Sequence, residues 1–123
     1  AGSPYYGIRS VYDGRYRYIV NLTPEATFQN VETKSPLFKE WKSLAETDSH
    51  AKAMTTKYQH RPAIELYDVK NDPYCMKNLA EDAKQASTIS RLDKELKRWM
   101  KDCGDEGQPT EMRAFEHMPG KRK

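Results

Sequence analysis

Long hydrophobic runs are absent from this sequence of 123 residues. A membrane-spanning helix needs about 20 mostly apolar residues, and the apolar runs here reach only a few, so we expect no membrane partner. Charge of one sign is not concentrated either, because 21 basic residues face 18 acidic ones and the net charge is +3. A nucleic-acid interface needs a stronger positive patch. We therefore expect no nucleic-acid partner.

Cysteine and histidine are scarce, with two and three residues. Their spacing fits neither a zinc site nor a redox pair, so we predict no metal site, and a disulfide between Cys75 and Cys103 stays open. The sequence also lacks a glycine-rich phosphate loop, a nucleophile motif and a paired-carboxylate arrangement. We predict no catalytic residue, and we interpret Glu65 and Asp68 as strand-edge and turn residues.

A strong β-hairpin signal lies near the start of the sequence. Aromatic and β-branched residues stand on both sides of Asp13-Gly14, a dipeptide that favours a two-residue hairpin loop. The sequence thus predicts a hairpin over residues 5–22, with Arg9 opposite Tyr18. Both faces of this hairpin carry apolar side chains, so we expect both faces of the sheet to be partly covered.

A third strand is predicted over residues 63–69, where an apolar-rich run stops at Asn71-Asp72-Pro73. Asn and Asp bond their own backbone and Pro removes a hydrogen-bond donor, so the strand cannot continue through these residues. Ser35-Pro36 is typical of a helix start. We predict extra helices in an insertion at residues 36–58.

A long helix is predicted over about residues 82–103, because apolar residues recur three and four apart. Its predicted stripe contains Ile89, Leu92, Leu96, Trp99 and Cys103, and Gly104 follows as a left-handed cap. We expect this stripe, with Trp99 buried, to pack on the sheet. The predicted fold class is α+β, a small antiparallel sheet packed by this helix, followed by an irregular tail at residues 105–123 in which Phe115 and Met118 dock weakly.

Five motifs occur in order along the chain, at residues 5–11 (YYGIRSV), 17–22 (RYIVNL), 65–68 (ELYD), 71–73 (NDP) and 78–80 (NLA). Together they resemble the carboxyl-terminal subdomain of the formylglycine-dependent sulfatases. The branch that they resemble most is sulfamidase, the heparan N-sulfatase. Two residues depart from that branch, because Gly7 stands where Pro is common and Cys75 where an acidic or polar residue is usual.

The resemblance implies that residues 1–104 form a sulfatase subdomain that packs against a large amino-terminal catalytic domain and shapes the pocket for a sulfated saccharide. Sulfatases convert a Cys or Ser, followed two residues later by Pro, into formylglycine, and no Cys or Ser here has Pro at that spacing. Formylglycine and calcium are therefore expected in the parent catalytic domain, and this chain alone is expected to be inert. The parent is expected to be periplasmic, secreted or lysosomal.

Arg9 is the one candidate site residue, since it lies in the motif at residues 5–11 and on a largely apolar face of the hairpin. One interpretation is a cation-π and packing contact with Tyr18. In the other, its planar fork binds acidic groups of the catalytic domain or borders the substrate pocket. An alternative function for the whole chain is a stand-alone carbohydrate-binding or protein-interaction module that uses the tyrosine-rich hairpin.

Overall fold

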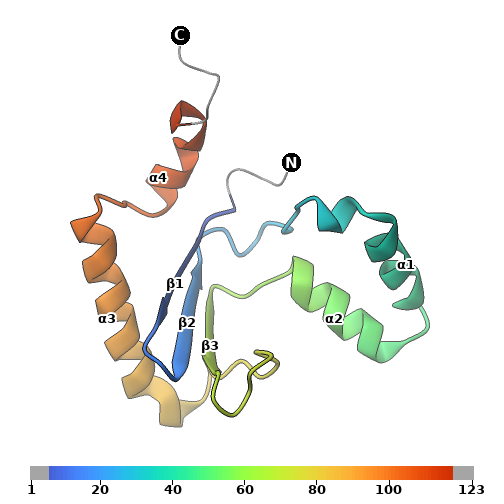
Figure 1. Ribbon diagram of the computed structural model, residues 1–123, viewed down its shortest axis with the longest axis horizontal. Coiled ribbons are helices and arrows are strands. Elements are labelled where there is room, and N and C mark those ends of the chain that lie inside the picture. The colour runs from blue at the N-terminus through green and yellow to red at the C-terminus, as the bar shows by residue number, and fades with distance from the viewer. Residues whose placement is uncertain (1–5, 118–123) are drawn as a thin grey trace.

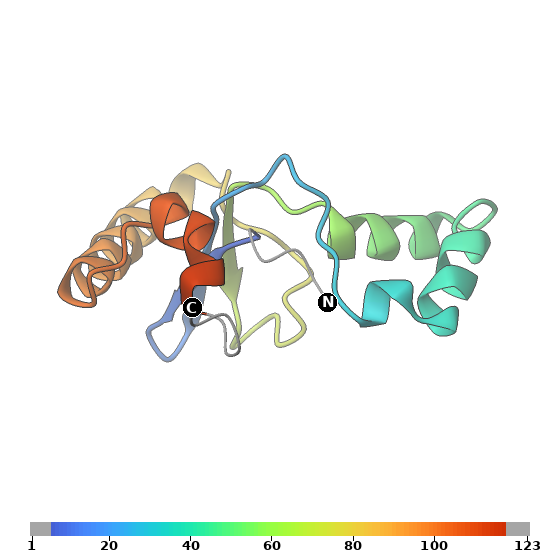
Figure 2. The ribbon, with the colours of Figure 1, turned by 90° about the horizontal axis from the view of Figure 1, so that it is seen from above.

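The computed structural model describes residues 6–117 and has the predicted α+β fold (Figure 1). Three antiparallel strands lie side by side in the order β1, β2, β3, and they span Ile8–Tyr12, Tyr16–Asn21 and Ile64–Asp68. A long helix covers one face of this sheet, and a helical hairpin extends to the opposite side (Figures 1 and 2). None of the described helices is long and apolar enough to cross a membrane.

The turn between β1 and β2 lies one residue further along the chain than predicted. Its central residues are Gly14, with φ of 100°, and Arg15, the pattern of a type II′ turn with glycine first. The Asp13 carboxylate accepts hydrogen bonds from the N–H groups of Arg15 (2.9 Å) and Tyr16 (2.7 Å). Asp13 therefore caps the turn from its flank instead of occupying a central position.

The shifted turn changes the strand register by two residues. Arg9 lies opposite Val20, and Tyr18 lies opposite Val11, so the predicted pairing of Arg9 with Tyr18 is wrong. Because side chains alternate with a period of two, a shift of two residues leaves every side chain on its predicted face.

The predicted insertion forms two helices, α1 over Pro36–Leu44 and α2 over Ser49–Gln59, after a short 3-10 turn, η1, at Glu32–Lys34. Ser35 caps α1 by accepting a hydrogen bond from the Phe38 N–H (3.1 Å), as the sequence predicts. Asp48 caps α2 through the Ala51 N–H (2.7 Å). The two helices pack against each other and project from the sheet on the side away from the long helix (Figure 2).

The long helix, α3, spans Ala86–Asp102 and follows a 3-10 turn, η2, at Ala83–Gln85. Leu92 and Leu96 are buried against Tyr18 and Leu66 of the sheet, so the core lies between α3 and this face. The predicted stripe is too wide, because Trp99 is 54% exposed and Cys103 is also exposed. Both cysteines are free.

The chain after α3 is more regular than predicted. Gly104, with φ of 70°, ends α3 as expected, and the Asp105 N–H donates to the Met100 carbonyl (2.8 Å) in the manner of a Schellman cap. Residues 105–117 then contain α4 (Gln108–Met112) and η3 (Ala114–His117) in place of an irregular segment. Phe115 is 37% exposed, and Met118 lies outside the described residues. The proposed domain boundary at residue 104 stays a prediction.

Candidate functional site

Glu65, the second residue of β3, is a fully buried carboxylate with 2% of its surface exposed. Strand alternation places Glu65 and Tyr67 on the face away from α3, whereas Leu66 between them enters the core under α3. Glu65 thus lies in an edge strand, as the sequence predicts, but its side chain is buried on the sheet face away from α3. Charged side chains are rarely buried to this degree unless they are paired.

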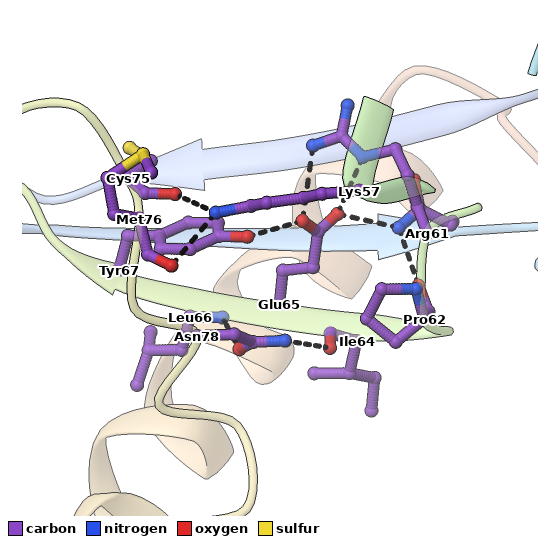
Figure 3. A network of polar contacts seen from close by, with 11 residues as sticks. Lys57, Arg61, Pro62, Ile64, Glu65, Leu66, Tyr67, Cys75, Met76 and Asn78 are labelled. Atoms are coloured by element: carbon purple, nitrogen blue, oxygen red, sulfur yellow. Dashed lines mark hydrogen bonds and ion pairs between the residues drawn. The ribbon is translucent and has the colours of Figure 1, made fainter. Parts of the chain in front are cut away.

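Four hydrogen bonds satisfy the Glu65 carboxylate (Figure 3). The Arg61 guanidinium donates twice, at 3.0 and 3.2 Å, and the Tyr67 hydroxyl donates at 2.6 Å. The Asn21 side chain donates the fourth bond from β2 at 2.8 Å. Burial raises the pKa of Glu65, but the bonds from Tyr67, Arg61 and Asn21 outweigh it and hold the pKa below its usual value. Glu65 is thus an ionised structural acceptor and a poor acid catalyst.

The same residues join α2 to β3. Arg61 lies four residues before Glu65 in the short connection that follows α2. The Asn21 amide donates to the Pro62 carbonyl (2.6 Å) as well as to Glu65, and the Asn21 N–H donates to the Ala63 carbonyl (2.9 Å). This buried network fixes the orientation of α2 relative to β3.

Lys57 attaches the loop after β3 to α2. Its Nζ donates to the carbonyls of Cys75 (2.5 Å) and Met76 (3.0 Å) and lies 5.2 Å from the centre of the Tyr67 ring (Figure 3). Cys75 has φ of 52°, which is unusual for a residue with a side chain. The two hydrogen bonds from Lys57 stabilise the loop in this conformation.

Asn78 satisfies the outer edge of β3. Its side chain accepts from the Leu66 N–H (3.0 Å) and donates to the Ile64 carbonyl (3.3 Å) (Figure 3). The Leu79 N–H adds a bond to the Leu66 carbonyl (2.8 Å). An exposed strand edge would otherwise present unpaired backbone groups, so the Asn78-Leu79 pair closes the sheet on this side.

The elements joined by this network border a cavity of about 550 Å³ that is open to solvent. We call it the α2–β3 cavity, and its lining residues include Arg17, Trp41, Lys57, Arg61, Glu65 and Tyr74. A second apolar cluster forms its inner wall, where the Phe28, Phe38 and Tyr58 rings meet at centroid distances of 5.5 to 5.9 Å. The cavity combines aromatic surfaces with three cations, and its one carboxylate is already fully bonded.

The single predicted site residue, Arg9, lies elsewhere, on the face covered by α3. Its guanidinium forms an ion pair with Asp105 and a second one with Glu111 (2.7 Å). The hydrogen bond and charge of Asp105 raise the pKa of Arg9, although burial opposes this, and the Arg9 bond lowers the pKa of Asp105. Arg9 thus attaches the segment after α3 to β1. Its role toward another domain or a substrate stays a prediction.

Among residues 6–117, no group of three or more His, Cys, Asp or Glu residues is arranged to hold a metal ion. The described residues therefore do not fit the calcium that the resemblance implies for the parent enzyme.

Two sulfatases are similar in sequence to this chain over most of its length. The chain is 33% identical over 108 residues to an ulvan-active sulfatase from Formosa agariphila, a match that covers 85% of this chain. A second ulvan-active sulfatase from the same organism is 32% identical over 97 residues. The chain is homologous to part of a sulfatase. It spans only 18% of the length of each of these relatives, and no protein-family model matches it.

Proposed function

We propose that this chain is the carboxyl-terminal part of a sulfatase that acts on a sulfated polysaccharide, where it packs against the catalytic domain and shapes the substrate pocket. One observation carries the proposal, which is the similarity to two ulvan-active sulfatases over most of this chain and over less than a fifth of theirs. A piece of this size leaves room in such a protein for a separate catalytic domain.

The catalytic groups of a sulfatase then belong to that larger domain. The chain contains no formylglycine motif, and the part that the structure describes contains no metal cluster. The chain by itself should release no sulfate from any sulfated sugar, with or without added calcium. Sulfate release by the purified chain would contradict this division of labour.

A chimera tests the proposal directly. The matching segment of an ulvan-active sulfatase from Formosa agariphila is replaced by this chain, and the same enzyme with the segment deleted serves as the control. We expect the chimera to release sulfate from ulvan and the deletion variant to release none. A chimera that unfolds cooperatively on heating but releases no sulfate from any sulfated sugar would contradict the proposal.

The same chimera separates two substrate classes. The motif at residues 5–11 resembles sulfamidase, which favours an N-sulfated sugar, whereas the curated relatives are active on ulvan. Ulvan and an N-sulfated glucosamine substrate are assayed side by side, with released sulfate as the readout. The difference between the chimera and the unmodified Formosa enzyme in their preference for ulvan or the N-sulfated substrate measures the contribution of this chain.

A further inference from the structure

We propose that the α2–β3 cavity binds a sulfated sugar unit, with the Arg17 guanidinium as its anion-binding group and with Trp41 and Tyr74 as its stacking surfaces. This inference rests on the proposed function for the choice of ligand. The site itself is built from the geometry and charge of the cavity.

The charge of the cavity is positive because its only carboxylate is already neutralised. Glu65 accepts two bonds from Arg61 and one each from Tyr67 and Asn21. Lys57 directs its ammonium at two backbone carbonyls, which carry no net charge. The lining contains three basic residues, Arg17, Lys57 and Arg61, and one acidic residue, Glu65. An acidic ligand is therefore attracted to this cavity.

Arg17 is the cation that remains available to a ligand. It is exposed, its guanidinium lies 5.6 Å from the centre of the Tyr12 ring, and it forms no ion pair with any of residues 6–117. The fork of an arginine binds the paired oxygens of a sulfate or carboxylate with two hydrogen bonds. Contact with the Tyr12 ring restricts the guanidinium beforehand and reduces the entropy lost on binding.

The aromatic surfaces of the cavity distinguish a sugar from a small inorganic anion. Trp41 is 49% exposed on α1, and Tyr74 is 86% exposed on the loop after β3. Both line the cavity, and large aromatic side chains present a flat apolar face with a polar edge. A pyranose ring has the matching properties, with apolar C–H groups on one face and hydroxyl groups around its rim. A volume of about 550 Å³ lies within the usual range for small-molecule sites.

The two tryptophans provide a localised binding assay. Trp41 lines the cavity, whereas Trp99 lies on α3, which packs on the opposite face of the sheet. The indole N–H signals of both residues are followed in one ¹⁵N-labelled sample of the full chain during titration with short ulvan oligosaccharides. We expect the Trp41 signal to shift in a saturable manner and the Trp99 signal to stay in place.

Matched variants test the assigned roles. Arg17→Gln should weaken binding at least tenfold. Arg98→Gln is the matched control and should leave binding unchanged, because it removes the same charge from an exposed residue of α3 that pairs with Glu95. Tyr74→Ala should weaken binding several-fold, and Trp99→Ala should leave it unchanged. Thermal unfolding of each variant confirms that the fold is retained.

Three further probes define the ligand class. Chemically desulfated ulvan oligosaccharides should bind at least tenfold more weakly, and inorganic sulfate alone should not saturate the Trp41 signal. An acidic peptide should also fail to displace the oligosaccharide. Equal binding of desulfated sugars would overturn the role of Arg17, tighter binding of the peptide would overturn the sugar assignment, and an unmoved Trp41 signal would overturn the site.

Failure of this inference can be distinguished from failure of the proposed function. An active chimera whose KM for ulvan is unchanged by Arg17→Gln would leave the sulfatase assignment intact and overturn the cavity as a sugar site. Saturable, Arg17-dependent binding of the oligosaccharide to the chain, combined with an inactive chimera, would support the cavity as a sugar site and contradict the sulfatase assignment.

Discussion

Replacement of Glu65 by Gln tests whether the buried carboxylate organises the junction of α2 and β3. Gln has nearly the same shape, but it carries an amide NH₂ in place of one oxygen. Oε1 accepts from Tyr67 and Arg61, and Oε2 accepts from Arg61 and Asn21. In either orientation the new NH₂ group of Gln therefore faces two donors.

The magnitude follows from the burial of the two partners. Removing one member of a buried ion pair typically costs about 3–5 kcal/mol, and leaving a buried hydrogen-bonding group unsatisfied costs about 1–3 kcal/mol. The Arg61 side chain keeps 28% of its surface exposed, so water replaces part of what it loses. We expect Glu65→Gln to lower the free energy of unfolding by about 3 kcal/mol at pH 7.

The pH dependence provides an independent check. The pKa of Glu65 is depressed in the folded chain, whereas a Glu in an unfolded chain has a pKa of about 4.3. A group with a depressed folded pKa stabilises the fold above its unfolded pKa, and this contribution is lost as the pH falls through the folded pKa. The difference in stability between the wild type and Glu65→Gln should be complete at pH 7 and shrink below about pH 4.

Urea unfolding followed by far-ultraviolet circular dichroism, between pH 3.5 and 7, measures both quantities. Glu95→Gln is the matched control, because Glu95 lies on the surface of α3 and pairs with Arg98 in solvent, where an ion pair contributes less than about 1 kcal/mol. A loss under about 1 kcal/mol for Glu65→Gln at pH 7, or a difference that does not shrink in acid, would refute the assigned role of the carboxylate.

Two further predictions concern the opposite face of the sheet. Leu92→Ala, at a side chain that is 1% exposed, should cost about 3 kcal/mol in urea unfolding, whereas Trp99→Ala, at 54% exposure, should cost less than about 1 kcal/mol. The reverse order would place the indole in the core. Arg9→Lys keeps the charge but loses the fork that holds Asp105 and Glu111; amide exchange should accelerate at residues 105–112 and stay constant in α3, and unchanged exchange at 105–112 would show that Arg9 does not hold this segment.

Helix ends were predictable from the sequence because their chemistry is local. Ser35 and Asp48 cap N–H groups three residues ahead of them, and Gly104 follows the last turn of α3. Each of these residues acts within one turn of the chain, so a short window of sequence contains both partners.

The hairpin register was not predictable in the same way. Two candidate loops, Asp13-Gly14 and Gly14-Arg15, both place a residue that tolerates positive φ in the turn. The choice depends on the Asp13 side chain, which bonds two N–H groups beyond it. Since the two registers keep the same faces, hydrophobic patterning could not decide between them.

The burial of Trp99 was overestimated because spacing alone does not give the width of a helix face. Leu92, Leu96 and Met100 recur every four residues and pack toward the sheet, with Met100 only partly buried. Trp99 precedes Met100 by one residue, which rotates it about 100° around the helix axis. A three-stranded sheet covers only part of α3, and this rotation leaves the indole half exposed.

Glu65 was missed because its partners come from three separate places in the sequence. Arg61 precedes it in the connection from α2, Tyr67 follows it in β3, and Asn21 belongs to β2, 44 residues away. One signal was available, because the strand alternation that places Leu66 in the core also places Glu65 beside Tyr67. That signal was outweighed by the general rule that carboxylates avoid the interior.

The motifs that resemble sulfatases supply both scaffold residues and part of the wall of the α2–β3 cavity. Asn21, Glu65 and Asn78 belong to the motifs, and each bonds backbone or side-chain groups that fix β3 and its connections. Arg17 and Glu65 line the cavity from within the motifs, whereas Trp41 and Tyr74 line it from outside them. Residues that hold a scaffold tolerate little change, whereas exposed wall residues can vary without loss of stability. We therefore expect sulfatases that share these motifs to differ in ligand preference mainly through the helical insertion and the loop after β3.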